Sequence, residues 1–367
     1  MDRQLIWTIK SREVRQSRKA LEELFSREDL FDETLIDRDG EAYENAVNDF
    51  EMARKMGCSV VTYPDELYPE KLRKIPQPPP VLFVMGNPRI LKETVFAGMV
   101  GARRCDSYGI RIAENIAMEI GQTGAGIVSG GAIGVDAASH RGAIRAKAPT
   151  VAVLGSGLDI AYPEENHGLF SEIVKNGGAV ISEFPFGEAA NGRNFPRRNR
   201  IIAALSSALV VVRAASKSGS LITASQAMDL DITVYAVPGN IDEKLSQGTN
   251  ELIRDGAAPL LSSFDVIDEL IALNPDYFAR EKDAGVFEYS RETSFVPEKK
   301  ERVVFTPELS EYEKEIINII NDGAETLSMI EQKISFEPTR MTALVQMMEI
   351  KGIIKKIPPN RYKINLK

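Results

Sequence analysis

One window of this sequence is positively charged although the chain as a whole is acidic. Between Ala189 and Met228 there is no aspartate or glutamate, while the formal net charge of the 367 residues is −8. The window contains the hydroxyl- and glycine-rich run 218–220, and its cationic side chains are those of Arg193, Arg197, Arg198, Arg200, Arg213 and Lys217. A positive, glycine-containing segment in an acidic protein predicts a binding site for a polyanion. A solvated basic face would explain the arginines, but it would not explain the apolar run ALVVV (208–212) between two basic clusters, so we favour the site.

Short apolar runs must position these side chains. They are the segments 95–100, 126–129, 150–155, 179–182, 208–212 and 233–237. Helical patterns alternate with them, near residues 107–121, 135–147, 165–176, 197–206, 219–230 and 247–255. Runs that are apolar throughout indicate strands buried on both faces, and therefore a parallel sheet between layers of helices. The sequence predicts an α/β fold with an extended Rossmann-like, doubly wound and mainly parallel sheet.

In such a sheet, ligands bind beyond the carboxyl ends of the strands. The expected strand ends carry glycine, hydroxyl and basic residues, in the segments 101–104, 129–132, 155–157, 182–185, 213–220 and 238–240. Glycine lets backbone amides approach an anion, and a following helix N-terminus adds positive charge. We expect FPRRNR (195–200) and SKSGS (216–220) to be neighbouring strand-end loops, before and after the ALVVV strand. No loop has the dinucleotide fingerprint or the lysine of a P-loop, so the convergence of several loops carries the prediction.

Few other residues offer catalytic or metal chemistry. Asp136 and His140 stand four residues apart on a predicted helix and have the chemistry of an acid–base pair. We favour a helix-capping aspartate and a histidine that is hydrogen-bonded nearby. With only two histidines and two cysteines, the chain has neither a disulfide framework nor a cysteine-rich metal site. No apolar run reaches the ~18 residues that span a bilayer, and the N-terminus has no signal-peptide pattern, so we expect a cytoplasmic protein.

The composition changes along the chain and divides it into four segments. They are a mainly helical N-terminal domain, a Rossmann-like domain, a charged linker and a winged-helix domain, at residues 1–80, 81–277, 278–306 and 307–367. The last segment is assigned from three helical patterns followed by the hairpin IIKKI–PPN–RYKIN. Its third helix holds only Arg340 at its start and Lys351 at its far end, which is little charge for a DNA groove. A protein-contact or structural module is therefore an equal alternative for this domain.

Eight motifs, in unbroken order, resemble those of one family. They are VGARRCDSYG, SGGAIGVDAASHRGAI, VAVLGSGLDIAYPEENHGLF, ISEFPFG, NFPRRNRIIAALS, SKSGSLITA, VYAVPGN and SQGTNELIRDGA. Together they extend over about residues 81–261 and closely resemble the DNA-processing protein A (DprA, also called Smf) family. The resemblance implies a protein of natural transformation that binds incoming single-stranded DNA, shields it and helps to load the RecA recombinase. It also implies an extended Rossmann-like domain that commonly forms a homodimer, an N-terminal helical domain and a C-terminal winged helix.

The DNA pocket of the family maps onto four segments of this sequence. The residues are Gly101, Ala102, Arg103, Ser129, Gly130, Gly131, Arg197, Arg198, Asn199, Arg200, Lys217, Ser218, Gly219 and Ser220. Basic side chains and backbone amides would hold phosphates, and aromatic rings would stack on bases. Phe195 is a candidate for stacking, although a core role is the interpretation we favour. The sequence departs from the family at Ile133 and Arg213, where the family usually has arginine and glutamate. Arg213 would either add positive charge or reflect surface drift.

Three function classes follow from these residues. The first is a non-catalytic single-stranded DNA-binding protein without catalytic residues, cofactor or metal. The second is an enzyme resembling the nucleoside monophosphate phosphoribohydrolases, which carry a PGGxGT loop and a nearby glutamate. Here Pro238-Gly239-Asn240 lacks the second glycine of that loop, although Glu183 could serve as an acid. The third, a transcription regulator, is disfavoured by the low charge of the winged helix. We favour the first class, with single strands bound more tightly than duplex.

Overall fold

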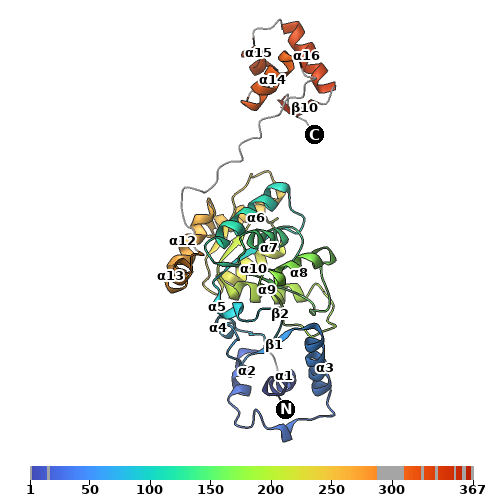
Figure 1. Ribbon diagram of the computed structural model, residues 1–367, viewed down its shortest axis with the longest axis vertical. Coiled ribbons are helices and arrows are strands. Elements are labelled where there is room, and N and C mark those ends of the chain that lie inside the picture. The colour runs from blue at the N-terminus through green and yellow to red at the C-terminus, as the bar shows by residue number, and fades with distance from the viewer. Residues whose placement is uncertain are drawn as a thin grey trace. The chain divides into compact units, whose positions relative to one another are not determined.

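The computed structural model describes residues 2–14, 17–286, 310–323, 326–334, 338–350, 353–357 and 361–364. The chain divides into two compact units, Met1–Ser294 and Phe295–Lys367 (Figure 1). The first unit contains the large sheet and all the residues expected to form the binding site. Within the described residues, no helix is long and apolar enough to cross a membrane.

Helices at the start of the first unit are attached to its sheet. They are α1 (Arg3–Glu13), α2 (Arg18–Phe25), η1 (Glu33–Leu35) and α3 (Glu41–Met56). Trp7 of α1 anchors them, because its buried indole donates to the Pro80 carbonyl (2.9 Å) and stacks on Tyr63, with 5.9 Å between ring centroids. After α3, β1 (Ser59–Thr62) pairs antiparallel with β2 (Val81–Gly86). The N-terminal segment therefore contributes a strand to the sheet, and the division expected at residue 80 falls between two paired strands.

In the described part of the chain, nine strands form one sheet in the order β1-β2-β6-β5-β4-β3-β7-β8-β9. The remaining strands are β3 (Phe96–Val100), β4 (Gly126–Ser129), β5 (Thr150–Val153), β6 (Ala179–Ser182), β7 (Ser206–Val211), β8 (Val234–Ala236) and β9 (Ala258–Pro259). Strands β3 to β9 pair in parallel, and β2 pairs antiparallel with β1 and β6. The expected α/β fold with a mainly parallel sheet is confirmed.

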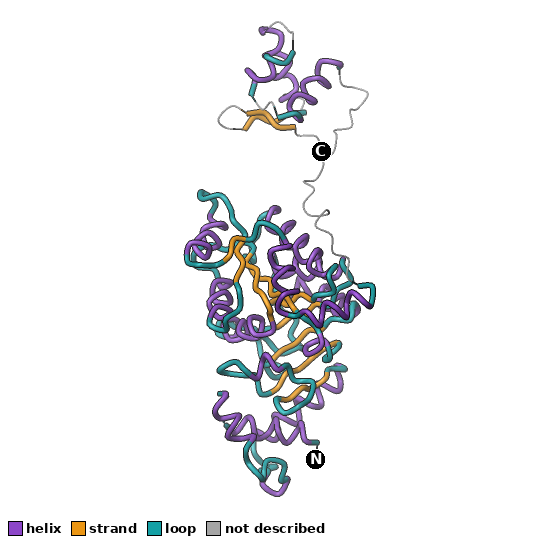
Figure 2. The backbone as a smooth tube through the Cα atoms, turned by 90° about the vertical axis from the view of Figure 1, so that its left-hand side faces the viewer, coloured by secondary structure: helices purple, strands orange, loops and turns teal. Residues whose placement is uncertain are grey.

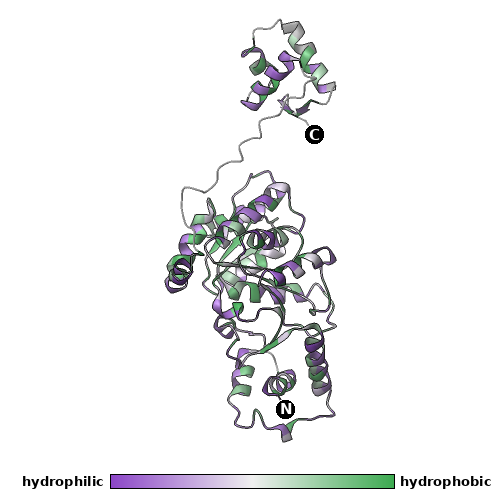
Figure 3. Ribbon diagram, in the orientation of Figure 1, coloured by the Kyte–Doolittle hydropathy of each residue, from purple (hydrophilic) through white to green (hydrophobic). Residues whose placement is uncertain are grey.

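Helices cover both faces of this sheet (Figure 2). They are α4 (Glu70–Arg73), α5 (Ile90–Glu93), α6 (Ser107–Gly121), α7 (Val135–Arg145), η2 (Glu164–Asn166), α8 (His167–Lys175), α9 (Asn194–Leu205), α10 (Gly219–Met228), α11 (Lys244–Arg254), α12 (Ser263–Leu273) and α13 (Pro275–Asp283). The central strands serve two separate cores: Leu209 and Val211 of β7 pack with α9 and α10, whereas Ala208 and Val210 pack with α6 and α12. Accordingly, the strands at the centre of the unit are coloured as hydrophobic in Figure 3. Burial on both faces explains why the strands are apolar at every position rather than at alternate ones.

The order of the strands reverses at β3, which lies between β4 and β7. The helix that follows β3, α6, packs on one face of the sheet, and the helix that follows β7, α10, packs on the other. The two connections diverge and leave a crevice beyond the carboxyl ends of β3 and β7. Ligands of doubly wound folds bind at such a topological switch point.

Two expectations about local structure are wrong. FPRRNR is not a strand-end loop, because α9 already begins at Asn194 and includes the whole motif. The start of the expected linker at residue 278 is wrong, since α13 extends to Asp283 and buries Phe278 in the core beside α6 and α12. Residues 287–306 of the expected linker lie outside the described residues.

The second unit has its own small core. Its elements are α14 (Glu311–Asn321), α15 (Leu327–Glu331), α16 (Pro338–Ile350), β10 (Ile354–Ile357) and β11 (Arg361–Ile364), and the two strands form an antiparallel hairpin. Ile316, Ile330 and Ile354 are among the apolar side chains buried between them. A capping box of Ser310 and Glu313 begins α14. The three helices and the hairpin occur in the order expected from the sequence.

Candidate functional site

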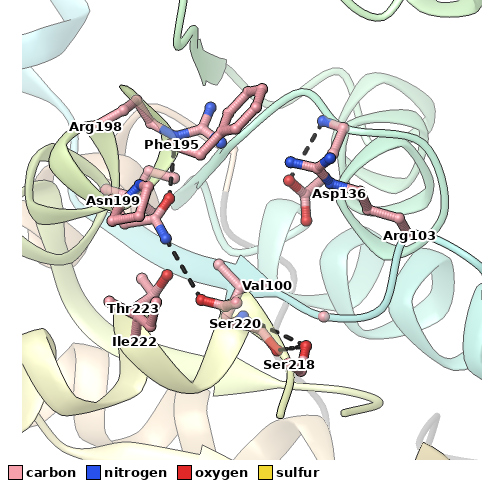
Figure 4. A pocket seen from close by; sticks show the side chains of 15 residues that line it. Val100, Arg103, Asp136, Phe195, Arg198, Asn199, Ser218, Ser220, Ile222 and Thr223 are labelled. Atoms are coloured by element: carbon pink, nitrogen blue, oxygen red, sulfur yellow. Dashed lines mark hydrogen bonds between the residues drawn. The ribbon is translucent and has the colours of Figure 1, made fainter. Parts of the chain in front are cut away.

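A pocket of about 280 Å³ occupies the crevice between the carboxyl ends of β3 and β7. It is lined by the loop after β3, the start of α7, and the first turns of α9 and α10 (Figure 4). The predicted residues among its lining are Gly101, Arg103, Arg198, Asn199, Ser218, Gly219 and Ser220. Segments that lie far apart in the sequence thus meet at one place, which we call the switch-point pocket.

The N-terminus of α10 opens into the switch-point pocket. Ser218 caps this helix, and its hydroxyl bonds the amide of Ser220 at 3.4 Å and the hydroxyl of Ser220 at 2.8 Å. Asn199 reaches across from α9 and donates its side-chain amide to the Gly219 carbonyl at 3.5 Å. Amides of the first helical turn carry partial positive charge, and the first turn of α10 contains no acidic residue. This end of the helix therefore favours an anion such as a phosphate.

Arg103 and Phe195 form a stacked pair at the pocket. The guanidinium carbon of Arg103 lies 4.6 Å from the centroid of the Phe195 ring. Phe195 is half-buried rather than enclosed in the core. Its ring also contacts the ring of Tyr162, with 5.7 Å between the centroids. A β-carbon at Gly155 would lie 2.9 Å from the ring, so glycine permits this close approach. An exposed guanidinium beside an accessible aromatic face offers both a phosphate contact and a surface for a base.

Arg198 and Asp136 form the buried floor of the site. Arg198 donates to the carbonyls of Gly130, at 2.6 Å, and Val153. Asp136 accepts the Ala132 amide at 3.3 Å, so part of the glycine loop before α7 already binds a carboxylate. Burial raises the pKa of Asp136 to about 6, against the attraction of Arg198, and burial lowers the pKa of Arg198 to about 10. Arg198 therefore acts mainly to hold the loops together.

Gly130 makes this arrangement possible. A β-carbon there would lie 2.6 Å from the Asp136 carboxylate and 2.7 Å from the Arg198 guanidinium. Any larger residue would push the two charged groups apart or out of the floor. Gly130 was predicted to contact an anion, but it makes room for two charged side chains of the protein itself. It lines a neighbouring pocket rather than the switch-point pocket.

Arg197 and Arg200 face Glu183 rather than the pocket. Arg200 binds both carboxylate oxygens, at 2.6 and 2.7 Å, and Arg197 binds one at 3.1 Å. The Glu183 side chain is only 1% exposed. These contacts fasten α9 to the loop after β6 and neutralise much of the positive charge expected from the sequence.

Other predicted residues support the loops. Ser129 is buried and donates to the Met99 carbonyl at 2.6 Å. Gly131 has a φ of 68°, which favours glycine, and its carbonyl accepts the Asn166 side-chain amide at 2.9 Å. Lys217 is exposed just before α10 and is placed to meet an approaching polyanion.

Some lining residues are absent from the sequence-based prediction. Ile202 of α9 and Ile222 and Thr223 of α10 all line the switch-point pocket. Each lies three or four residues after a predicted residue of its own helix, on the same helical face. Helical spacing is therefore the signal that could have identified them.

His140 is not part of the site. Its ring Nδ1 lies 2.7 Å from the Thr150 hydroxyl, in the fully buried core. Burial lowers its pKa to about 3, so the ring is neutral at physiological pH. The histidine is hydrogen-bonded in the core, as expected. The expected helix-capping role of Asp136 is wrong, because the N-cap of α7 is Gly134, and Asp136 lies inside the helix and accepts the amide of Ala132 from the preceding loop.

Arg213 neither adds charge to the pocket nor lies on the surface, so both explanations considered for it are wrong. Its side chain is 4% exposed and forms ion pairs with Asp106 and, at 2.8 Å, with Glu243. Its backbone carbonyl accepts the amide of Ala102, one of the predicted site residues, at 2.8 Å. Ile133, at the other departure, is 37% exposed and lines the neighbouring pocket.

The comparison with known proteins agrees with this geometry. Residues 59–271 match the family model of DNA recombination-mediator protein A. The chain belongs to this family. Protein Smf of Synechocystis is 39% identical over 216 residues, which are 58% of this chain and 54% of that protein. The match therefore spans about half the length of that relative.

Two solved structures of family members resemble the chain. DNA processing protein A (DprA) of Streptococcus pneumoniae has a TM-score of 0.62 and 30% identity, covering 73% of this chain and 98% of that one. DNA processing protein A of Helicobacter pylori has a TM-score of 0.53 and 30% identity, covering 58% and 96%, and its structure concerns a single-stranded DNA binding mode. These matches confirm the family recognised from the eight motifs.

Proposed function

We propose that the chain binds single-stranded DNA at the switch-point pocket and acts as a recombination mediator in natural transformation. The observation that carries the proposal is the combination of Arg103, which lies over the half-buried ring of Phe195, with the N-terminus of α10, whose first turn contains no acidic residue. Single strands are held without sequence preference by phosphate contacts together with base stacking. The single-stranded DNA binding of the H. pylori relative supports the same ligand class.

Unpaired bases fit this site better than a duplex does. Phe195 lines a pocket of about 280 Å³ rather than a flat surface, so a base must leave its stack to reach the ring. Bases of a duplex remain stacked on their neighbours, and unstacking them costs a few kcal/mol per step. The phosphates of a duplex would still be attracted to Arg103 and Lys217, which predicts a weaker complex.

We also propose that the chain is not an enzyme. Glu183, the acid considered for a phosphoribohydrolase-like reaction, is held by two arginines and is almost inaccessible. Asp136, a carboxylate in the lining, is held by the Ala132 amide. Release of free base from nucleoside monophosphates by the purified protein would overturn this part of the proposal.

Further parts of the proposed function concern the whole protein. They are protection of incoming DNA in the cytoplasm, loading of RecA, a homodimer through the Rossmann-like domain and a winged-helix fold for the second unit. The family description as a recombination mediator supports RecA loading, and the order of three helices and a hairpin supports the winged helix. RecA loading would be measured as faster RecA filament growth on strands covered by single-strand-binding protein. An unchanged growth rate would contradict it.

A mobility-shift experiment across a salt series tests DNA binding. We expect tighter binding of single strands than of duplex. In a plot of log affinity against log salt concentration, the slope should become shallower by roughly 0.7 for each phosphate contact that a substitution removes. The variant Arg103→Ala/Lys217→Ala should bind at least about tenfold more weakly, whereas Arg89→Ala should not. Arg89→Ala is a control for the loss of one exposed positive charge, because Arg89 is 70% exposed and precedes β3 at the amino edge of the sheet. Arg200 is left intact, since its removal would leave Glu183 buried with less charge compensation. Equal affinities of all three proteins would exclude the site.

A further inference from the structure

A second pocket adjoins the switch-point pocket. Its volume is about 450 Å³, and it shares Arg103, Ala132, Phe195 and Arg198 with the first pocket. Its other wall is formed by residues that do not line the switch-point pocket: Ile133, Gly155, Ala161, Tyr162, Pro163, Glu164 and Glu165. A strand whose phosphate lies at Arg103 therefore has a neighbouring cavity within reach of its base. We call this cavity the lateral pocket.

The lateral pocket has a fixed aromatic wall. The rings of Tyr162 and Phe195 lie 5.7 Å apart between centroids, and Tyr162 is 43% exposed. Directly after Tyr162, the short helix η2 (Glu164–Asn166) is fastened to the glycine loop, because Asn166 is buried and donates to the Gly131 carbonyl at 2.9 Å. The aromatic wall and the two glutamates that follow it therefore keep their place beside the loop. Flat, partly exposed rings are suited to stacking on a nucleobase.

Carboxylates in a site for a polyanion require an explanation, because they repel phosphates. Glu164 and Glu165 are both exposed and both line the lateral pocket. An ionised carboxylate can only accept hydrogen bonds, so it favours a ligand edge that presents donors. Guanine presents two adjacent donors, N1–H and the N2 amino group. Thymine presents a single N3–H between two carbonyl oxygens, which a carboxylate repels.

The arginine of the pocket favours the same base. Guanine carries the acceptors O6 and N7 on its other edge, and arginine binds this pair in the commonest specific contact between proteins and DNA. Arg103 is exposed, and its guanidinium carbon lies over the Phe195 ring, so a group with five N–H donors borders the lateral pocket. Donors on one edge and acceptors on the other therefore match the carboxylates and the guanidinium of the lateral pocket.

We propose that the lateral pocket is a guanine-selective subsite, in which Glu164 or Glu165 accepts the N1–H and N2 amino donors while Arg103 faces O6 and N7. This proposal rests on the proposed function, since the base belongs to a strand whose phosphates occupy the switch-point pocket. It adds a base preference to binding that is otherwise independent of sequence. Phosphate contacts position the strand, and the carboxylates select the base that enters the cavity.

Competition between oligonucleotides tests the preference. A thymine-only strand is compared with strands of equal length in which spaced thymines are replaced by guanine, adenine or cytosine. The spacing prevents guanine quadruplexes. Fluorescence anisotropy of the full chain should show roughly tenfold tighter binding of the guanine strand than of the thymine strand. In at least one of the variants Glu164→Ala and Glu165→Ala, the ratio of the affinities for the guanine and thymine strands should fall below about twofold. The N1–H and N2 amino donors of guanine lose their acceptor in that variant.

Glu172→Ala is the matched control. Glu172 is an exposed carboxylate on α8, so its replacement changes the net charge equally without altering the lateral pocket, and the guanine preference should persist. Equal affinities for all strands in the wild type would overturn the subsite, and if those affinities remain high and salt-dependent the proposed function stands. Failure to bind any strand would overturn the proposed function itself. Competition by free dGMP as effective as that of the guanine strand would assign the pocket to a free nucleotide and overturn the strand assignment.

Discussion

At the scale of single residues, the positive charge counted in the sequence differs from the charge available to a ligand. The window 189–228 contains no acid, yet three of its arginines form ion pairs with acids that other segments contribute. Arg197 and Arg200 pair with Glu183, and Arg213 pairs with Asp106 and Glu243. Local composition cannot reveal such partners, because they are brought into contact only by the fold. Arg103, which lies outside the window, is the exposed arginine that lines the pocket.

Two buried titratable groups have opposite effects on acid stability. Burial lowers the pKa of His140 from 6.5 to about 3 and raises that of Asp136 from 3.8 to about 6. Below about pH 6.5 the unfolded chain protonates His140 and the folded chain does not, so acid removes stability through this residue. Between about pH 6 and 4 the folded chain keeps a proton on Asp136 that the unfolded chain has lost, so acid adds stability there. The two contributions nearly cancel in this range.

Asp136→Asn should remove this compensation. Between about pH 6 and 4.5 we expect the free energy of unfolding of the variant to fall by about 2 kcal/mol more than that of the wild type, at about 1.4 kcal/mol per pH unit. Urea titrations at a series of pH values measure the difference. His140→Gln should show the reverse trend and gain stability relative to the wild type as the pH falls. Parallel profiles of wild type and Asp136→Asn would contradict the raised pKa.

At the scale of elements, the sequence predicted what depends on local pattern. The central strands were expected close to their observed positions, because each is an uninterrupted apolar run. FPRRNR was expected as a strand-end loop before ALVVV, but it lies in α9. Pro196 is the third residue of this helix, where a helix has no internal partner for the N–H that proline lacks. Strand β9 has only two residues and therefore no detectable period. Which elements line the switch-point pocket depends on the order of the strands in the sheet, and no local sequence pattern encodes that order.

Arg213 joins three elements, and its replacement tests whether it serves the fold or the ligand. It follows β7 and binds Asp106, the cap of α6, and Glu243, the cap of α11. Arg213→Met should lower the free energy of unfolding by about 2 kcal/mol. Breaking a fully buried ion pair costs about 3–5 kcal/mol, and we expect less here because both carboxylates are 40% exposed. Affinity for single strands should stay within about twofold, because the guanidinium does not line the pocket.

Thermal or urea unfolding and a binding titration on the same preparation separate the two effects. Arg254→Met is a suitable control, since both members of its ion pair with Asp255 are exposed and such a surface pair should contribute little to stability. A large loss of affinity in Arg213→Met without a loss of stability would show that the arginine serves the ligand.

At the scale of the whole molecule, the N-terminal segment and the site are mechanically linked. Asp49 of α3 accepts the amide of Phe186 at 3.2 Å, in the segment after β6 that also carries Glu183. Glu183 in turn holds α9 through Arg197 and Arg200. The N-terminal helices thereby brace a loop on which one wall of the pocket depends. This support could not be predicted from the sequence, because Asp49 is one of many acids in a helix with no distinguishing motif.

We propose that the homodimer forms at the carboxyl ends of β8 and β9, where an exposed apolar side chain follows each strand. These adjacent parallel strands are followed by Ile241, which is 90% exposed, and Leu261, which is 79% exposed. Strand β9 lies at the edge of the sheet but is short and ends in Pro259, which discourages pairing of strands between copies. We therefore expect the subunits to associate through side chains at this end of the sheet.

Ile241→Asp/Leu261→Asp should dissociate the dimer at micromolar concentration, because each aspartate would place a charge in an apolar interface. Light scattering after size exclusion measures the mass, and Leu35→Asp, at a residue 53% exposed among the N-terminal helices, is the matched control. A wild-type protein that remains monomeric would refute the dimer, whereas a double variant that remains dimeric would refute only this surface.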